Sequence, residues 1–173
     1  MDRRRGVVMI NTGHGKGKTT AALGAVLRAA GQGLSCLVLQ FIKSDGGYGE
    51  IKSLSRLPGV ETRSLGLGLM GKGDLTPHRE AARDAWRQAQ DAVRSGAWDL
   101  IVLDELCIAM RHGFVSLEEV VELIKAKPAE LILIITGRDC PPELFAHADA
   151  VTEMKMIKHH LNAGISSQAG VEY

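Results

Sequence analysis

The stretch NTGHGKGKTT, residues 11–20, constrains the fold of this chain more than any other part of it. It follows a short apolar run, VVMIN at 7–11, and precedes an alanine-rich segment of helical character at 18–30. Glycines recur at positions 13, 15 and 17, so the backbone can turn its N–H groups inward. Such a loop between a strand and a helix attracts anions, because unpaired N–H groups and the helix dipole both favour negative charge. The context therefore predicts a phosphate-binding loop.

The loop departs by one position from the common pattern G-x-x-x-x-G-K-[ST]. Counting back five residues from Gly17 reaches Thr12, and the first glycine comes one place later, at Gly13. We expect Gly13 to supply the turn instead. Lys18 is predicted to bring a positive charge to the phosphates and Thr19 a hydroxyl for Mg²⁺. The other candidate phosphate-binding residues of the loop are His14, Gly15, Lys16 and Thr20.

A second motif, DLIVLDEL at 99–106, ends an apolar run in two adjacent acids. The pattern is typical of a Walker B strand, whose first acid, here Asp104, meets Mg²⁺ directly or through water. Glu105 follows at once, and two roles are open to it: a further metal ligand, or the residue that orients water in an ATPase. The sequence thus predicts a Mg²⁺ site at Thr19 and Asp104, with Glu105 either a further ligand or the residue that orients water.

Short apolar runs alternate with helical patterns along the chain. Strands are predicted at 7–11, 34–41, 60–65, 99–105, 131–136 and 150–154. Helices are predicted at 18–30, from an N-cap at Thr76 to about 95, from a capping box of Ser116 and Glu119 to about 126, and briefly after Pro142, with a loop at 43–50. Apolar strands alternating with helices indicate an α/β fold with a mostly parallel sheet covered on both faces. At 173 residues without linker or repeat, we expect one domain spanning 1–173.

Composition argues against two classes of partner. The formal net charge is +1, so no global basic field points to nucleic acid. No apolar stretch approaches the roughly 20 residues of a membrane span, so we expect no membrane association. The three cysteines show neither CxxC nor zinc spacing, and Cys36 and Cys107 lie in or beside apolar runs. Buried free thiols and a cytoplasmic location are the expectation.

Polar residues leave two further strands at the edge where ligands bind in such sheets. The candidates are Gln40, Phe41 and Lys43 after one strand and Thr136, Gly137 and Arg138 after another. Strand ends also carry polar residues for solubility alone, so both interpretations stay open here. Lys158 and His159 in the tail are weaker candidates, because paired basic residues commonly form a solvated face. The other four histidines show no ligand spacing, and we expect them to be structural.

Six stretches resemble one family, in order and spacing, across nearly the whole chain. They are TGHGKGKTTAALG, VLQFIKS, DLIVLDEL, LIITGRDCP, ADAVTEM and IKHHLNAGISSQAGVEY. The first and last are the most specific, since a generic P-loop ATPase has no reason to end in such a tail. The family is that of the corrinoid adenosyltransferases, of the cob(I)yrinic acid a,c-diamide or cob(I)alamin type.

The resemblance implies a three-layer P-loop NTPase fold of the recombinase type and a homodimer. It implies ATP as co-substrate, Mg²⁺, and a cobalt-carrying corrinoid substrate: cobinamide, cobyrinic acid diamide or cobalamin. In the implied reaction Co(I) attacks the 5′ carbon of ATP, the adenosyl group moves to cobalt, and triphosphate leaves whole. A reductase or reduced flavoprotein is the implied source of electrons.

The resemblance also implies roles for individual residues. Lys18, Thr19 and Glu105 are the implied catalytic residues, with Thr19 and Glu105 the first metal contacts and Asp104 the next. ATP is implied to lie reversed, so that Lys18, Lys16 and the loop amides stabilise a departing triphosphate. Contacts to ATP or corrinoid are implied for residues 12–20 and for Gln40, Lys43, Arg138, Lys158 and His159.

One segment departs from the family pattern. Members often carry an aromatic G-E-G-F-T-W segment that helps to displace the corrinoid's lower ligand, and the corresponding stretch here is GLGLMG at 66–71. Leu69 and Gly71 replace the aromatic residues. The change leaves room for apolar filling by Leu67, Leu69 and Met70 and excludes stacking or wedging by rings.

Two other functions are open from the sequence. One is a P-loop ATPase in which Glu105 positions the attacking water. The other is a non-catalytic protein that senses nucleotide, for example one that delivers corrinoid.

Overall fold

The computed structural model describes residues 5–44, 47–68, 70–71 and 73–172. These residues form one sheet in the order β3-β2-β4-β5-β1-β6, and every neighbouring pair is parallel. The strands are β1 Val8–Thr12, β2 Cys36–Gln40, β3 Val60–Ser64, β4 Leu100–Asp104, β5 Ile132–Thr136 and β6 Ala150–Glu153. Each begins and ends within two residues of its predicted bounds, which confirms the expected parallel α/β sheet.

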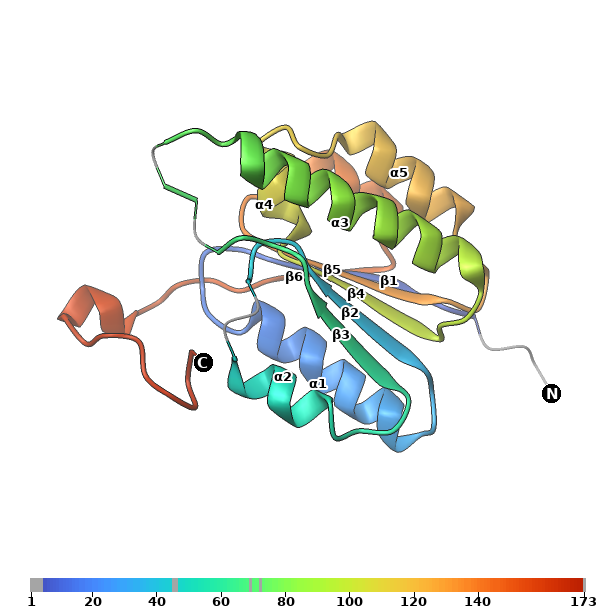
Figure 1. The fold of residues 1–173 in the computed structure, drawn as a ribbon, viewed down its shortest axis with the longest axis horizontal. Helices are drawn as coiled ribbons and strands as arrows, with labels where there is room; N and C mark the ends of the chain where they lie inside the picture. Colours follow the sequence, from blue (N-terminus) through green and yellow to red (C-terminus); the bar gives the residue numbers. More distant parts are fainter. Residues whose placement is uncertain (1–4, 45–46, 69, 72, 173) are drawn as a thin grey trace.

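Helices cover both faces of the sheet (Figure 1). One face carries α1 Lys18–Gly31 and α2 Gly49–Leu54, and the other carries α3 Thr76–Ser95, α4 Leu106–Arg111 and α5 Leu117–Ala126. Two short 3₁₀ helices follow, η1 Pro142–His147 and η2 His160–Ala163. None of the helices in the described ranges is both long and apolar enough to cross a membrane.

Helix ends show where local prediction succeeded and where it was wrong. The capping box is confirmed, because Ser116 and Glu119 exchange both expected hydrogen bonds. Thr76 is not the N-cap of α3: it is the first helical residue, and its N–H donates to the Asp74 carboxylate at 2.9 Å. The predicted loop at 43–50 is wrong at its end, where Gly49 begins α2. Helices α2, α4 and η2 were not predicted, since four to six residues are too few to show helical periodicity.

Two apolar clusters hold the layers together, because alternate strand residues point to opposite faces. The larger cluster, between the sheet and α3 to α5, includes the fully buried Trp86. The smaller cluster joins Ala22 and Val26 of α1 to alternate residues of β2, β4 and β5. The three cysteines are buried and free, as expected for Cys36 and Cys107.

The sheet face beneath α1 turns polar where the strands end. A row of polar residues crosses five neighbouring strands: Ser64, Gln40, Asp104, Thr136 and Asn11. Within it the Ser64 hydroxyl donates to Gln40 Oε1 at 2.9 Å, and the Thr136 hydroxyl donates to Asp104 Oδ1 at 2.7 Å. This row lies at the carboxyl ends of the strands, the edge where ligands bind in open parallel sheets.

The glycine loop connects β1 to α1 and is closely approached by the chain that follows β6. Gly13 adopts φ 96° and Gly17 φ 113°, so Gly13 supplies the expected left-handed turn. A Cβ on Gly13 or Gly15 would lie 2.6 Å from the Met154 carbonyl oxygen. The Gly15 N–H donates to that same oxygen at 2.6 Å. Glycine is therefore required here both for conformation and for space.

Two glycine substitutions should have opposite effects. Gly13→Ala is expected to lower the free energy of unfolding by about 1–3 kcal/mol, because a left-handed backbone and a backbone clash are both imposed. Gly24→Ala, inside α1 with nothing within 4 Å of its added Cβ, should raise it by about 0.5–1 kcal/mol. Urea unfolding measures both. Equal effects of the same sign would contradict this account of the loop.

Candidate active site

Asp104 is the centre of the site. Its side chain is fully buried, and Oδ1 accepts hydrogen bonds from Thr19 Oγ1 at 2.8 Å and Thr136 Oγ1 at 2.7 Å. Thr19 belongs to the first turn of α1 and Thr136 ends β5, so one carboxylate connects the phosphate loop to two strands. Buried carboxylates need such donors, because an unpaired buried charge is strongly unfavourable.

The other oxygen of this carboxylate is not hydrogen-bonded within the described part of the chain. Asp104 Oδ2 is buried and has no hydrogen-bond partner among the described residues. Leaving a buried acceptor unpaired is costly, and such groups in native proteins commonly serve an ion or water. Together with the Thr19 hydroxyl and the Glu105 carboxylate it offers the hard oxygen donors that Mg²⁺ prefers. The residues present therefore fit the predicted magnesium site.

Glu105 is held in an uncommon backbone conformation beside this site. Its φ is 62°, and its N–H donates to Thr136 Oγ1 at 2.9 Å. A non-glycine residue in this left-handed region persists only where its surroundings impose it, which is frequent in active sites. Burial, followed by the adjacent Asp104 charge, raises the pKa of Glu105 to about 7, although Lys43, Lys18 and Arg138 oppose the rise. Glu105 thus titrates near neutral pH.

The Lys18 side chain folds back onto the glycine loop. Its ammonium donates to the carbonyl oxygens of Gly13 at 2.7 Å and Gly15 at 2.8 Å. Burial, followed by the Arg138 charge, lowers the pKa of Lys18, while Glu105 and Asp104 act in the opposite direction. An ammonium has three N–H donors, so these two bonds leave a third for an anion.

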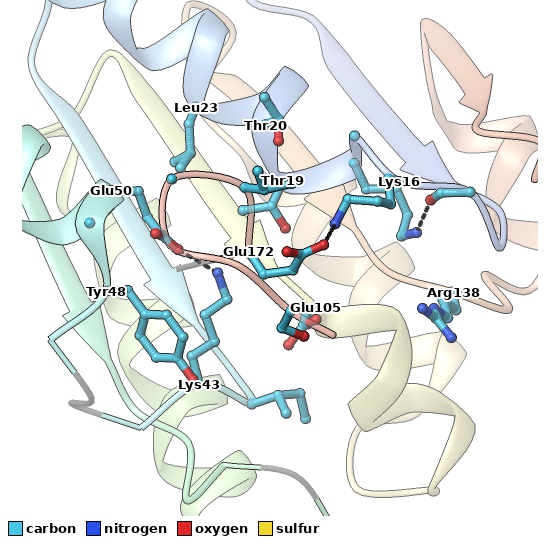
Figure 2. Close-up of a pocket in the computed structure, with 18 of the residues that line it drawn as sticks. Lys16, Thr19, Thr20, Leu23, Lys43, Tyr48, Glu50, Glu105, Arg138 and Glu172 are labelled. Atoms are coloured by element: carbon cyan, nitrogen blue, oxygen red, sulfur yellow. Dashed lines mark hydrogen bonds and ion pairs between the residues drawn. The ribbon is translucent and has the colours of Figure 1, made fainter. Parts of the chain in front are cut away.

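A cleft of about 790 Å³ opens beside these residues (Figure 2). Its volume lies within the range of small-molecule and cofactor sites. The loop lines one side, and apolar or aromatic side chains line other parts. The lining residues are Gly15, Lys16, Gly17, Lys18, Thr19, Thr20, Leu23, Ile42, Lys43, Tyr48, Gly49, Glu50, Ser53, Glu105, Ile108, Arg138, His159, Leu161, Ser167, Gly170, Val171 and Glu172.

Lys43 is fixed on the opposite wall by two neighbours. Its ammonium lies 2.5 Å from Glu50 Oε1 and 5.0 Å from the centre of the Tyr48 ring. Burial lowers the pKa of Lys43, but the hydrogen bond to Glu50 and the Asp104 charge outweigh it, and the net change is upward. The cleft therefore presents a permanent cation on this wall as well as on the loop.

Of the sixteen residues with implied roles, ten meet at the cleft and six do not. The cleft brings together Gly15, Lys16, Gly17, Lys18, Thr19, Thr20, Lys43, Glu105, Arg138 and His159. Thr12, Gly13 and His14 line a separate hollow of about 250 Å³, where His14 pairs with Asp139 at 3.2 Å. Asp104 and Gln40 are buried in the polar row behind the cleft, and Lys158 is exposed outside its lining.

Three charged or aromatic residues of the cleft were not predicted: Tyr48, Glu50 and Glu172. Glu172 Oε1 accepts from Lys16 Nζ at 2.6 Å, so the end of the chain reaches the phosphate loop. Glu172 lies in the family-like stretch IKHHLNAGISSQAGVEY, and this was the one sequence signal that could have identified it. Tyr48 and Glu50 follow a polar loop that carries no comparable pattern.

The segment that lacks aromatic residues is only partly described. Met70 packs against the larger apolar cluster, whereas Leu67 has 54% of its surface exposed. Leu69 lies outside the described residues. Apolar filling is thus supported at Met70 alone, while Leu67 remains exposed to solvent.

The raised pKa of Glu105 predicts a stability that depends on pH. The folded protein holds this proton up to about pH 7, against the ordinary value of 4.5, so stability is present below pH 4.5 and is lost as pH rises through 7. Glu105→Gln removes the titration. The variant should exceed the wild type in unfolding free energy by about 1–3 kcal/mol at pH 8 without metal, and by little at pH 4.5. Urea unfolding at both pH values measures this, and a pH-independent difference would contradict it.

Comparison with known proteins identifies the family. The chain matches the family model for ATP:corrinoid adenosyltransferase BtuR/CobO/CobP over residues 4–173. It is 38% identical to a corrinoid adenosyltransferase of Pseudomonas aeruginosa over 175 residues, covering 98% of this chain and 84% of that protein. Identity is 37% to a corrinoid adenosyltransferase of Escherichia coli K12 and to corrinoid adenosyltransferase CobA of Salmonella typhimurium, each covering 98% of this chain and 86% of the relative.

A solved structure supports the fold. The KaiC-like protein PH0186 from Pyrococcus horikoshii OT3 superposes with a TM-score of 0.61 at 17% identity, over 90% of this chain and 75% of that chain. This likeness bears out the expected P-loop α/β fold and carries no statement on activity. On the family match and its relatives, the chain belongs to the ATP:corrinoid adenosyltransferase family.

Proposed function

We propose that this chain transfers the adenosyl group of ATP to the cobalt of a reduced corrinoid. The Co(I) electron pair forms a bond to the 5′ carbon of ATP, the bond between that carbon and its oxygen breaks, and triphosphate leaves with the bonding pair. The observation that carries the proposal is the convergence of the Lys18–Thr19 loop and Glu105 on one cleft of about 790 Å³, with Asp104 buried behind it, in a chain of this family.

The loop can stabilise the leaving group. Lys18 and the amides of the glycine loop bind the triphosphate, with Lys16 and Arg138 at the same cleft supplying further positive charge. As the carbon–oxygen bond breaks, negative charge grows on the departing oxyanion, and fixed cations stabilise that charge more than the ground state. On this account Lys18 acts on a departing polyanion and transfers no phosphoryl group.

Magnesium would be held by Thr19, Asp104 and Glu105, because Thr19 and Asp104 supply adjacent hydroxyl and carboxylate oxygens and Glu105 adds a carboxylate at the cleft. When bound, it would neutralise charge on the phosphate oxygens. The protein would have to supply Glu105 in its ionised form. Since its pKa is about 7, affinity for the cation is expected to rise as pH increases through neutrality.

The rest of the cleft suits a larger and less polar molecule. Leu23, Ile42 and Ile108 give it apolar surface, and Tyr48 contributes a ring. We assign the corrinoid and the nucleoside to this part. The described cleft residues do not distinguish between cobinamide, cobyrinic acid diamide and cobalamin. The proposal therefore includes all three.

The proposal extends to the cellular setting. A reductase or reduced flavoprotein would supply the electrons that bring cobalt to Co(I). We further propose a cytoplasmic homodimer whose subunits are each a single domain. The ATPase alternative for Glu105 is not favoured, because the three relatives named above are corrinoid adenosyltransferases.

Replacement of Lys18 tests the role of the loop. Lys18→Ala is expected to lower kcat/KM for adenosyl transfer by about 10²–10³, the loss typical when one fixed donor to a developing charge is removed. The assay supplies ATP, Mg²⁺ and chemically reduced corrinoid, and follows inorganic triphosphate together with the absorption of the cobalt–carbon bond.

Lys125→Ala is the matched control, because Lys125 is an exposed residue at the end of α5 outside the cleft. It should leave the rate unchanged. Near-normal turnover by Lys18→Ala would show that this loop is not the catalytic cradle. Release of orthophosphate without corrinoid would favour the ATPase instead.

A further inference from the structure

The end of the chain lies across the phosphate side of the cleft. Leu161, Ser167, Gly170, Val171 and Glu172 all contribute to the cleft lining. The segment 160–172 has its own internal hydrogen bonds, including the Ile165 N–H to the His160 carbonyl at 3.1 Å and the Glu172 N–H to the Gln168 carbonyl at 3.0 Å. It is therefore a folded cover over the loop.

Glu172 connects this segment to the phosphate loop (Figure 2). Its Oε1 lies 2.6 Å from Lys16 Nζ and 3.0 Å from His160 Nε2, and its Oε2 accepts from the Gln168 N–H at 2.9 Å. The hydrogen bond from Lys16, followed by that from Gln168, lowers the pKa of Glu172. The ionised Glu172 carboxylate thus pairs with a cation of the loop that is expected to bind phosphate.

Apolar packing holds this segment only weakly. Its larger apolar side chains are exposed: Leu161 by 53%, Ile165 by 47% and Val171 by 59%. None of them belongs to either apolar cluster of the described residues. Segments with few buried apolar contacts open at low free energy, so the polar contacts of Glu172 dominate the attachment.

We propose that residues 160–172 form a lid on the cleft, in which Glu172 holds Lys16 until the phosphates of ATP take its place. The proposal rests on the proposed function in one respect, that the triphosphate binds to this loop. Glu172 and a triphosphate carry the same sign of charge, so they compete for the Lys16 ammonium. Glu172 thereby weakens ATP binding and also helps to expel the triphosphate product.

The test is the affinity of the full chain for ATP and for inorganic triphosphate, each measured by calorimetry with Mg²⁺. Glu172→Gln keeps the shape of the side chain and removes its charge. It should lower Kd for both ligands about two- to fivefold, the range expected when one partly exposed ion pair no longer competes. Glu143→Gln removes one exposed carboxylate outside the cleft and should leave both Kd values unchanged.

A double-mutant cycle identifies the partner. In a Lys16→Ala background the Glu172→Gln substitution should have no effect, because the ammonium for which the anions compete is gone. Unchanged or weaker binding by Glu172→Gln would overturn the proposal. So would an equal gain from Glu143→Gln, or a gain that persists without Lys16. If the wild type binds neither ATP nor triphosphate, the proposed function fails at the loop itself, which is a distinguishable result.

Discussion

The buried carboxylate of Asp104 is the constraint on which the rest of the site depends. A charge removed from water must be stabilised by hydrogen-bond donors. Here the hydroxyls of Thr19 and Thr136 both donate to Asp104 Oδ1. Those contacts fix the first turn of α1 against β4 and β5. The second oxygen is left without a described partner, and it is this oxygen that suits a cation. One residue thus sets the position of the phosphate loop and, in the proposed function, would also set the place of the metal.

The charge distribution around Asp104 suits a leaving polyanion. Lys16, Lys18, Lys43 and Arg138 surround the cleft, and Glu105 is the ionisable carboxyl beside the metal site. Because its pKa is about 7, Glu105 carries a proton in part of the population near neutral pH and would lose it on binding a cation. In the proposed reaction these cations and one metal would together bind the triphosphate and stabilise it as it leaves.

Local patterns predicted the parts of this site that local chemistry determines. The glycine loop, the acid at the end of β4 and the capping box of α5 each depend on residues close in sequence, and each is found where expected. Contacts made by distant segments could not be read in this way. Glu172 forms a hydrogen bond with Lys16, which lies 156 positions away in the sequence. Gln40 accepts a hydrogen bond from Ser64 of the neighbouring strand. Both depend on the tertiary packing of the sheet and tail.

In the proposed reaction the bond between oxygen and the 5′ carbon of ATP breaks, and no bond to phosphorus does. ATP carrying ¹⁸O between the 5′ carbon and the α-phosphorus tests it most directly, in a reaction with reduced corrinoid and Mg²⁺. Mass spectrometry of the products locates the label. We expect all of it to leave with intact triphosphate, while the 5′-deoxyadenosyl group is recovered on cobalt without it. Label retained in ADP or AMP, with orthophosphate or pyrophosphate released, would contradict the account.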